Sequence, residues 1–201
     1  MVALNTARRF FAQSNGIART ADMHAAGLSV SALRALSREG HIRRIRHGWY
    51  QLAEQEYVPE EQLLASLLPE AVLCVESALH YYGYSDFTPR QWCIAVPRSV
   101  SPSRMRTELL HFKAYYIPDE LHPLGKASAE VNGVVLPIYD RERTICDCFK
   151  YKSRLDREMF AAALRAYAED ERKNLPLLYR YARKMGLTTK VNDIMEVLLH
   201  E

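Results

Sequence analysis

The sequence has few cysteines, no long apolar run and little net charge. Four of its 201 residues are cysteines, Cys74, Cys93, Cys146 and Cys148, and no two of them form a CxxC pair. Because this spacing suits neither a zinc knuckle nor a disulfide scaffold, we expect reduced and mostly buried thiols. No run of about 18 apolar residues is present to span a bilayer, and the first residues do not read as a signal peptide. We therefore expect a soluble, cytoplasmic protein with no membrane partner.

The local motifs of the common catalytic sites are also missing. The sequence has no P-loop, no GxGxxG after a predicted strand, no HExxH and no GxSxG. Asp140, Glu142 and Asp147 resemble a set of metal carboxylates. A helix cap, a solvated first-turn acid and an ion-pair partner for Arg143 explain them more simply. We expect no catalytic residues, no metal and no cofactor.

The charge is unevenly distributed along the chain. Residues 1–52 contain eight arginines and two carboxylates, a net charge of +6, so the remainder of a chain with net charge +3 carries −3. A basic amino-terminal part on a slightly acidic body predicts nucleic acid as the partner of the first part. A second basic stretch, the loop from Arg98 to Arg106, is as consistent with a contact surface as with a solvated loop.

Two short helices separated by glycine turns are predicted between residues 20 and 40. Thr20 is expected to cap the first helix, and Gly27 is expected to end it. Ser29 is expected to cap the second, which continues to about Arg38 and stops at Gly40.

The second of these helices has two unlike faces. Its packing face is predicted to consist of Val30, Leu33 and Leu36. The opposite face, at the spacing i, i+3, i+4 and i+7, presents Ser31, Arg34, Ala35 and Arg38. Two guanidinium groups, a hydroxyl and a small methyl are what a helix needs in order to read base edges in the major groove.

A basic hairpin is predicted directly after this helix. Gly48 allows the tight reversal, and Tyr50 and Leu52 face inward against Ile42 and Ile45. Since the two isoleucines are three residues apart, we expect a bulge near Arg44. The unit is interpreted as a winged helix-turn-helix with a cationic wing; a small helical domain with a solvated basic face is the alternative. The residues expected to contact DNA are Ser29, Ser31, Arg34, Arg38, Arg43, Arg44, Arg46, His47 and Trp49.

A second domain is predicted after an acidic stretch, AEQEYVPEEQ, that follows Leu52. We place the domains at residues 1–56 and 57–201. Short apolar runs from Ala71 onwards predict a small mixed sheet of four or five strands, with a hairpin at Asn132 and Gly133. Helical spacing dominates the last third. The predicted fold class is α+β (mixed α/β), with a winged helix-turn-helix followed by an α/β domain and C-terminal helices.

Three segments together resemble one protein family. They are GIARTADMHAAGLSVSALRALSREGHIRRIRHGWYQL, ESALHYYGYSD and PIYDRERTICDCFKY. In this order they are similar to the AbiEi antitoxins of type IV abortive-infection toxin–antitoxin systems, and the resemblance extends over nearly the whole chain. Cys146 and Cys148 depart from it, since aliphatic residues are expected there, which leaves a redox role open.

The resemblance implies a function for each domain. It implies that the winged helix binds inverted repeats in its own promoter and represses the operon, with the recognition helix at residues 29–38 and the wing at residues 43–49. It also implies that the second domain counters a nucleotidyltransferase toxin without catalysis of its own. The chain lacks the Gly-Ser pair and Asp-x-Asp element of such a toxin. Because one small winged helix buries little DNA surface, we expect a homodimer on the operator.

Two other functions are consistent with the same residues. One is a metal-dependent nucleic-acid-processing enzyme that its winged helix delivers to substrate, which predicts turnover that depends on Asp140. The other is a ligand-sensing transcriptional regulator without a toxin partner, in which the second domain holds an effector pocket.

Overall fold

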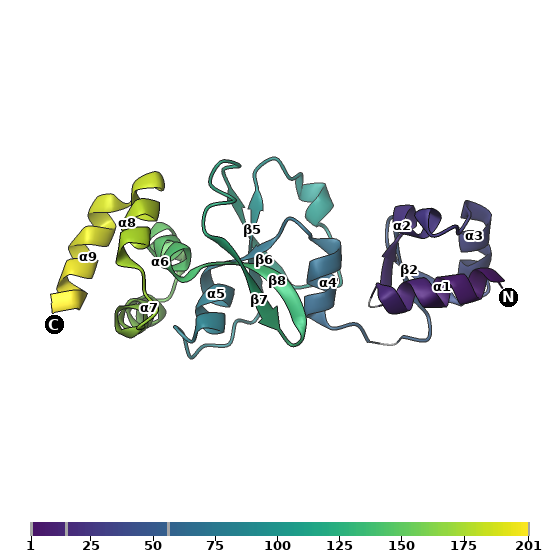
Figure 1. Ribbon diagram of the computed structural model, residues 1–201, viewed down its shortest axis with the longest axis horizontal. Helices are drawn as coiled ribbons and strands as arrows, with labels where there is room; N and C mark the ends of the chain where they lie inside the picture. Colours follow the sequence, from purple (N-terminus) through teal and green to yellow (C-terminus); the bar gives the residue numbers. More distant parts are fainter. Residues whose placement is uncertain (1, 15, 56, 201) are drawn as a thin grey trace. The chain divides into compact units, whose positions relative to one another are not determined.

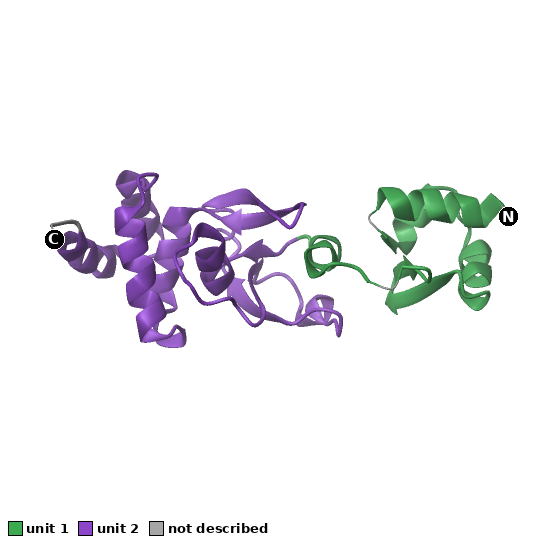
Figure 2. Cartoon of the chain, turned by 90° about the horizontal axis from the view of Figure 1, so that it is seen from below, with its two compact units in different colours: residues 1–69 green, residues 70–201 purple. Residues whose placement is uncertain are grey.

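The computed structural model describes residues 2–14, 16–55 and 57–200, with side chains as far as residue 198 (Figure 1). The chain divides into two compact units, Met1–Pro69 and Glu70–Glu201 (Figure 2). Helix α4 (Glu60–Leu67) is thereby grouped with the first unit. The sequence instead places a domain boundary at residues 56 and 57; Glu56 lies outside the described residues, and that boundary stays a prediction.

The first unit surrounds a small core with helices and a three-stranded antiparallel sheet of order β1-β3-β2. Its core is built from apolar side chains of every element before α4, among them Ala7, Phe11, Met23, Leu33 and Ile42. The elements are α1 (Val2–Gln13), β1 (Ile17–Arg19), α2 (Thr20–Ala25), α3 (Val30–Arg38), β2 (Ile42–Arg46) and β3 (Trp49–Leu52).

Two local predictions for this unit are wrong. Thr20 does not cap α2: it is the first helical residue, and its backbone N–H donates to Gly48 O at 2.9 Å. Arg19 occupies the cap position in an extended conformation, because the preceding residues form the unpredicted strand β1. Val30 does not pack inward and is 52% exposed.

The second unit contains a five-stranded mixed sheet of order β6-β5-β4-β8-β7. Strands β4 and β8 are parallel, as are β5 and β6, whereas β7 and β8 form an antiparallel hairpin. The hairpin turns at Asn132 (φ 49°) and Gly133 (φ 80°), which confirms that prediction. The strands are β4 (Val72–Leu73), β5 (Trp92–Pro97), β6 (Phe112–Ile117), β7 (Lys126–Val131) and β8 (Val134–Tyr139).

Helices complete the second unit. Helix α5 (Val75–Tyr82) and the 3-10 turn η1 (Pro102–Met105) lie between strands. After the sheet come α6 (Arg141–Lys150), the 3-10 turn η2 (Lys152–Arg154), α7 (Arg157–Glu169), α8 (Leu175–Lys184) and α9 (Thr188–His200), which gather at one end of this unit (Figure 1). Their apolar faces and one face of the sheet share a single core. The predicted α+β fold class is confirmed.

Two further features of the structure concern the cysteine thiols and the length of the helices. All four thiols are buried, and burial raises their pKa values above the ordinary range. Among the described residues, no helix is both long and apolar enough to cross a membrane.

Candidate nucleic-acid interface

Helix α3 is fixed in place at its start and along one face. Ser29 Oγ accepts a hydrogen bond from the backbone N–H of Ala32 at 3.1 Å, which confirms the predicted cap. The same hydroxyl lies 2.9 Å from Ser31 Oγ, so the two serines of the predicted site are hydrogen-bonded to each other. Leu33 and Leu36 are buried and attach the helix to the core.

The outward face of α3 carries charge without a counter-ion. Arg34 and Arg38 are exposed, and within the described part of the chain neither forms an ion pair. Val30 precedes Arg34 by four residues, so both side chains lie on one face of the helix. A methyl-bearing side chain beside a guanidinium is suited to a thymine methyl next to a guanine edge.

The hairpin of β2 and β3 has the predicted bulge. Ile42 pairs with Leu52 and Arg44 with Tyr50, after which the register shifts so that Arg46 pairs with Trp49. Gly48 has φ 74°, which a residue without Cβ adopts most easily. His47 is exposed in this turn. The glycine and the bulge together give the tip of the hairpin its sharp reversal.

An aromatic side chain lies between two arginines on three adjacent strands. Trp49 pairs with Arg19 on β1 and with Arg46 on β2. The Arg19 guanidinium carbon lies 5.6 Å from the centroid of the Trp49 ring, within cation–π range. We define this row, Arg19, Trp49 and Arg46, as the wing row. Sequence reasoning missed Arg19, because a strand of three residues has no readable alternation.

The other two wing arginines are held by the hairpin itself. Arg43 donates from Nε and Nη2 to Gln51 Oε1 at 3.3 and 3.1 Å, and Gln51 Nε2 donates to Gln55 O at 2.7 Å. Arg44 Nε donates to Arg46 O at 3.3 Å, and its cross-strand neighbour is Tyr50, whose ring packs on the core. The wing arginines therefore do not all share one face of the sheet.

The structure thus sorts the predicted residues into two groups within the first unit. The first group lies on α3 and its cap and consists of Ser29, Ser31, Arg34 and Arg38. The second lies on the hairpin and consists of Arg43, Arg44, Arg46, His47 and Trp49. Arg8 adds less positive charge to the surface of the first unit than an unpaired arginine would, because it forms an ion pair with Glu54. Guanidinium groups on a helix and on an adjacent hairpin can bind phosphates and base edges of one duplex.

The acidic residues of α6 are structural in the second unit. Asp140 Oδ1 accepts from the backbone N–H of Arg143 at 2.8 Å and caps the helix, as predicted. Glu142 is not solvated, contrary to prediction: it is 5% exposed, and its Oε1 accepts from Asn174 N at 2.8 Å and from Tyr167 Oη at 3.2 Å. No group of three or more potential metal ligands occurs among the described residues.

Comparison with known proteins identifies a matching family model and similar solved structures. Residues 5–53 match the family model described as "Transcriptional regulator, AbiEi antitoxin", which confirms the resemblance for the N-terminal domain. The fold is similar to that of the RV2827C protein from Mycobacterium tuberculosis, with a TM-score of 0.63 and 17% identity over 100% of this chain and 77% of that chain. No curated protein matches the sequence.

Proposed function

We propose that this protein is a DNA-binding autorepressor and antitoxin of a type IV toxin–antitoxin system, and that it counteracts a nucleotidyltransferase toxin. The observation that carries the proposal is the outward face of α3, on which Arg34 and Arg38 form no ion pair with any described residue. The family match over residues 5–53 supports it independently, since those residues include α3 and the hairpin.

The proposed contacts follow from the geometry of the two groups. Arg34 reads a base edge, with Val30 and Ser31 beside it, and Arg38 binds the adjoining phosphate. The wing row and His47 bind the backbone or the minor groove. Arg43 and Arg44 then contribute mainly through their charge, because their guanidinium groups already donate to Gln51 and to Arg46 O.

Two copies on an inverted repeat are proposed for tight binding. A single module of this size buries about 600–1,000 Å² on DNA, and a second copy on a symmetric half-site doubles that area. Two protomers per operator is the stoichiometry expected from mass measurement of the complex; one protomer per operator at saturation would contradict it.

The test separates DNA binding from toxin neutralisation in the full chain. The double variant Arg34→Ala, Arg38→Ala is expected to lose binding to a duplex containing the inverted repeat and to derepress a reporter fused to the promoter. Arg9→Ala, an exposed arginine on α1, is the matched control and is expected to behave as wild type. Operator binding that survives in the double variant would refute the proposed interface.

Neutralisation is tested by co-expression with the product of the neighbouring reading frame, which the proposal expects to be a nucleotidyltransferase. The wild-type chain is expected to restore growth, and the DNA-binding double variant is expected to do so as well when supplied from a heterologous promoter. Absence of rescue by the wild-type chain would refute the antitoxin part of the proposal and leave the regulator part standing.

A further inference from the structure

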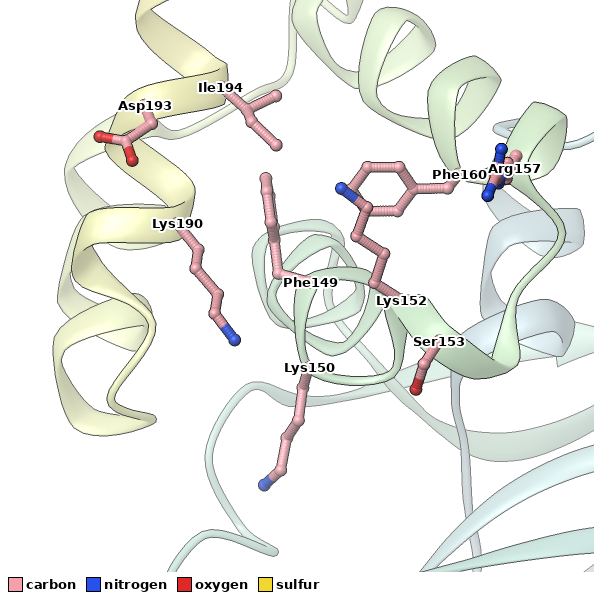
Figure 3. A pocket seen from close by; sticks show the side chains of 9 residues that line it. All are labelled: Phe149, Lys150, Lys152, Ser153, Arg157, Phe160, Lys190, Asp193 and Ile194. Carbon is pink, nitrogen blue, oxygen red and sulfur yellow. The ribbon is translucent and has the colours of Figure 1, made fainter.

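The second unit contains an open cavity that the proposed function does not use. It has a volume of about 920 Å³ and lies where the end of α6, the turn η2 and the first turns of α7 and α9 come together (Figure 3). Its apolar lining consists of Phe149 and Phe160, in edge-to-face contact at 5.5 Å, and of Ile194. A volume of this order is that of a small-molecule site.

Positive side chains surround this apolar lining. Lys150, Lys152, Arg157 and Lys190 line the cavity, against the single carboxylate of Asp193. We call these four cations and the apolar lining the basic groove. Within the described part of the chain, none of the four cations forms an ion pair. Figure 3 shows Asp193 directed to the outer side of α9, away from the lysines of η2 and α6.

Helix stability does not explain two of these cations. Arg157 is the first residue of α7, and Lys190 lies in the first turn of α9. The amino-terminal end of a helix carries a partial positive charge, so a cation there is unfavourable and an anion favourable. At α7 the carboxylates of Asp156, which caps the helix, and of Glu158 already offset this effect. An anion in the groove would therefore relieve the repulsion mainly at Lys190 of α9.

Nearby positive charges also act on Lys150, and an anion in the groove would offset them. Burial, together with the charges of Arg143 and Arg98, lowers the pKa of Lys150, and the charge of Asp147 only partly opposes this. Lys152 Nζ lies 4.8 Å from the centroid of the Phe160 ring, so its ammonium is held over the apolar lining. Ser153 adds a hydroxyl at the edge.

Another hollow in this unit does not offer such a site. It is lined by Tyr84, Asp170 and Arg172, among others, and Asp170 already binds the guanidinium groups of Arg172 and Arg141. The Asp170 carboxylate is paired within the protein, whereas the cations of the basic groove form no ion pair among the residues that the structure describes.

We propose that the basic groove binds a phosphate chain, from either a nucleoside triphosphate or inorganic pyrophosphate. Several cations that line one groove match the charge of linked phosphates. The apolar lining can accept a nucleoside. This inference goes beyond the proposed function, because it gives the second unit a ligand of its own.

Calorimetric titration of the full-length protein at low salt tests the proposal. ATP or pyrophosphate is expected to bind, and adenosine, which lacks phosphate, is expected not to. Binding of ATP alone identifies a nucleotide as the ligand, and equal binding of both identifies the phosphate chain alone. If neither ATP nor pyrophosphate binds, the proposal is overturned.

Charge reversal locates the site. Lys152→Glu and Lys190→Glu are expected to weaken binding at least about tenfold each, because each replaces an attractive charge with a repulsive one. Lys184→Glu is the matched control: this exposed lysine of α8 does not line the groove, and the variant is expected to bind as wild type. Unchanged binding in both groove variants would overturn the assignment, and thermal unfolding of each variant checks that it is folded.

A last comparison separates this inference from the proposed function. The Arg34→Ala, Arg38→Ala variant is expected to bind ATP as wild type, and the two groove variants are expected to retain operator binding. Loss of ATP binding in the α3 variant would place the ligand in the first unit and overturn the inference.

Discussion

Arg143 and Asp147, one helical turn apart on α6, form an ion pair in the interior of the second unit. Nε of Arg143 lies 3.1 Å from Oδ1 of Asp147, and the two side chains are 0% and 1% exposed. The guanidinium also donates from Nη1 to Leu121 O at 2.7 Å and to Leu124 O at 2.8 Å. It lies over the Tyr139 ring, 4.1 Å from the centroid. Arg143 thereby ties the loop between β6 and β7 to α6.

Breaking this pair is expected to destabilise the protein strongly. Asp147→Asn leaves the buried Arg143 charge without a counter-ion, which costs about 3–5 kcal/mol of unfolding free energy. Urea denaturation measures the loss. Glu70→Gln removes one partner of the exposed ion pair with Arg104 and is the control, expected to cost less than about 1 kcal/mol. Equal losses in the two variants would mean that the buried pair has no special role.

Arg143 is also part of a four-residue element at the start of α6 that belongs to one of the three segments resembling the AbiEi antitoxins. In Asp140-Arg141-Glu142-Arg143, the first residue caps α6, the third binds the start of α8 through Asn174 N, and the fourth forms the buried pair. Gly125 fits this arrangement, because a Cβ at its φ of 74° would lie 2.5 Å from Arg143 Cβ. These contacts give the acidic residues structural roles.

Local signals were the part of the fold that could be predicted from the sequence. Ser29, Gly48 and the Asn132–Gly133 turn act through neighbours a few residues away, and each was predicted correctly. The burial of Glu142 depends instead on Tyr167 and Asn174, which lie 25 and 32 residues further along. No pattern around Glu142 carries that information.

Some features of the candidate sites are likewise visible in the local sequence, whereas others depend on the tertiary structure. The helical spacing of Arg34 and Arg38 is visible in the sequence, whereas the wing row depends on the register of three strands, one of them only three residues long. The basic groove depends on three separate stretches that meet in space. Val30 was misassigned because its spacing from Leu33 fits the packing face, although the helix turns it to solvent.

The cap of α3 gives a prediction on stability. Ser29→Ala removes the oxygen that accepts from Ala32 N and is expected to cost about 1 kcal/mol. Ser37→Ala, an exposed serine of the same helix without a capping role, is the control and is expected to change stability by less than about 0.5 kcal/mol. Thermal unfolding of the three proteins checks the difference, and indistinguishable midpoints for the two variants would exclude a stabilising cap.

The contribution of Asp170 to the stability of the fold is expected to decrease at acid pH. Partial burial raises its pKa, but hydrogen bonds from Tyr84, Arg172 and Arg141 outweigh this and hold the pKa well below the ordinary range. A depressed folded-state pKa adds stability above the unfolded value of about 3.9, and this is lost as the pH falls through the folded value. The difference in urea midpoint between wild type and Asp170→Asn should therefore shrink from about pH 5 to about pH 3. A difference that stays constant over this range would contradict this role of Asp170.

The two groups of the proposed DNA interface are expected to fail in different ways. Arg34→Ala removes a base-reading guanidinium from α3, so it should cost about 1–3 kcal/mol on the operator and little on random duplex. Arg46→Ala removes a wing-row charge, so it should weaken binding to both duplexes alike and lower the slope of log K against log salt by about one. Fluorescence anisotropy on operator and scrambled duplexes over a salt series measures both effects. Equal losses on the two duplexes for both variants would mean that α3 contacts only phosphates, because a helix that reads bases must distinguish the two sequences.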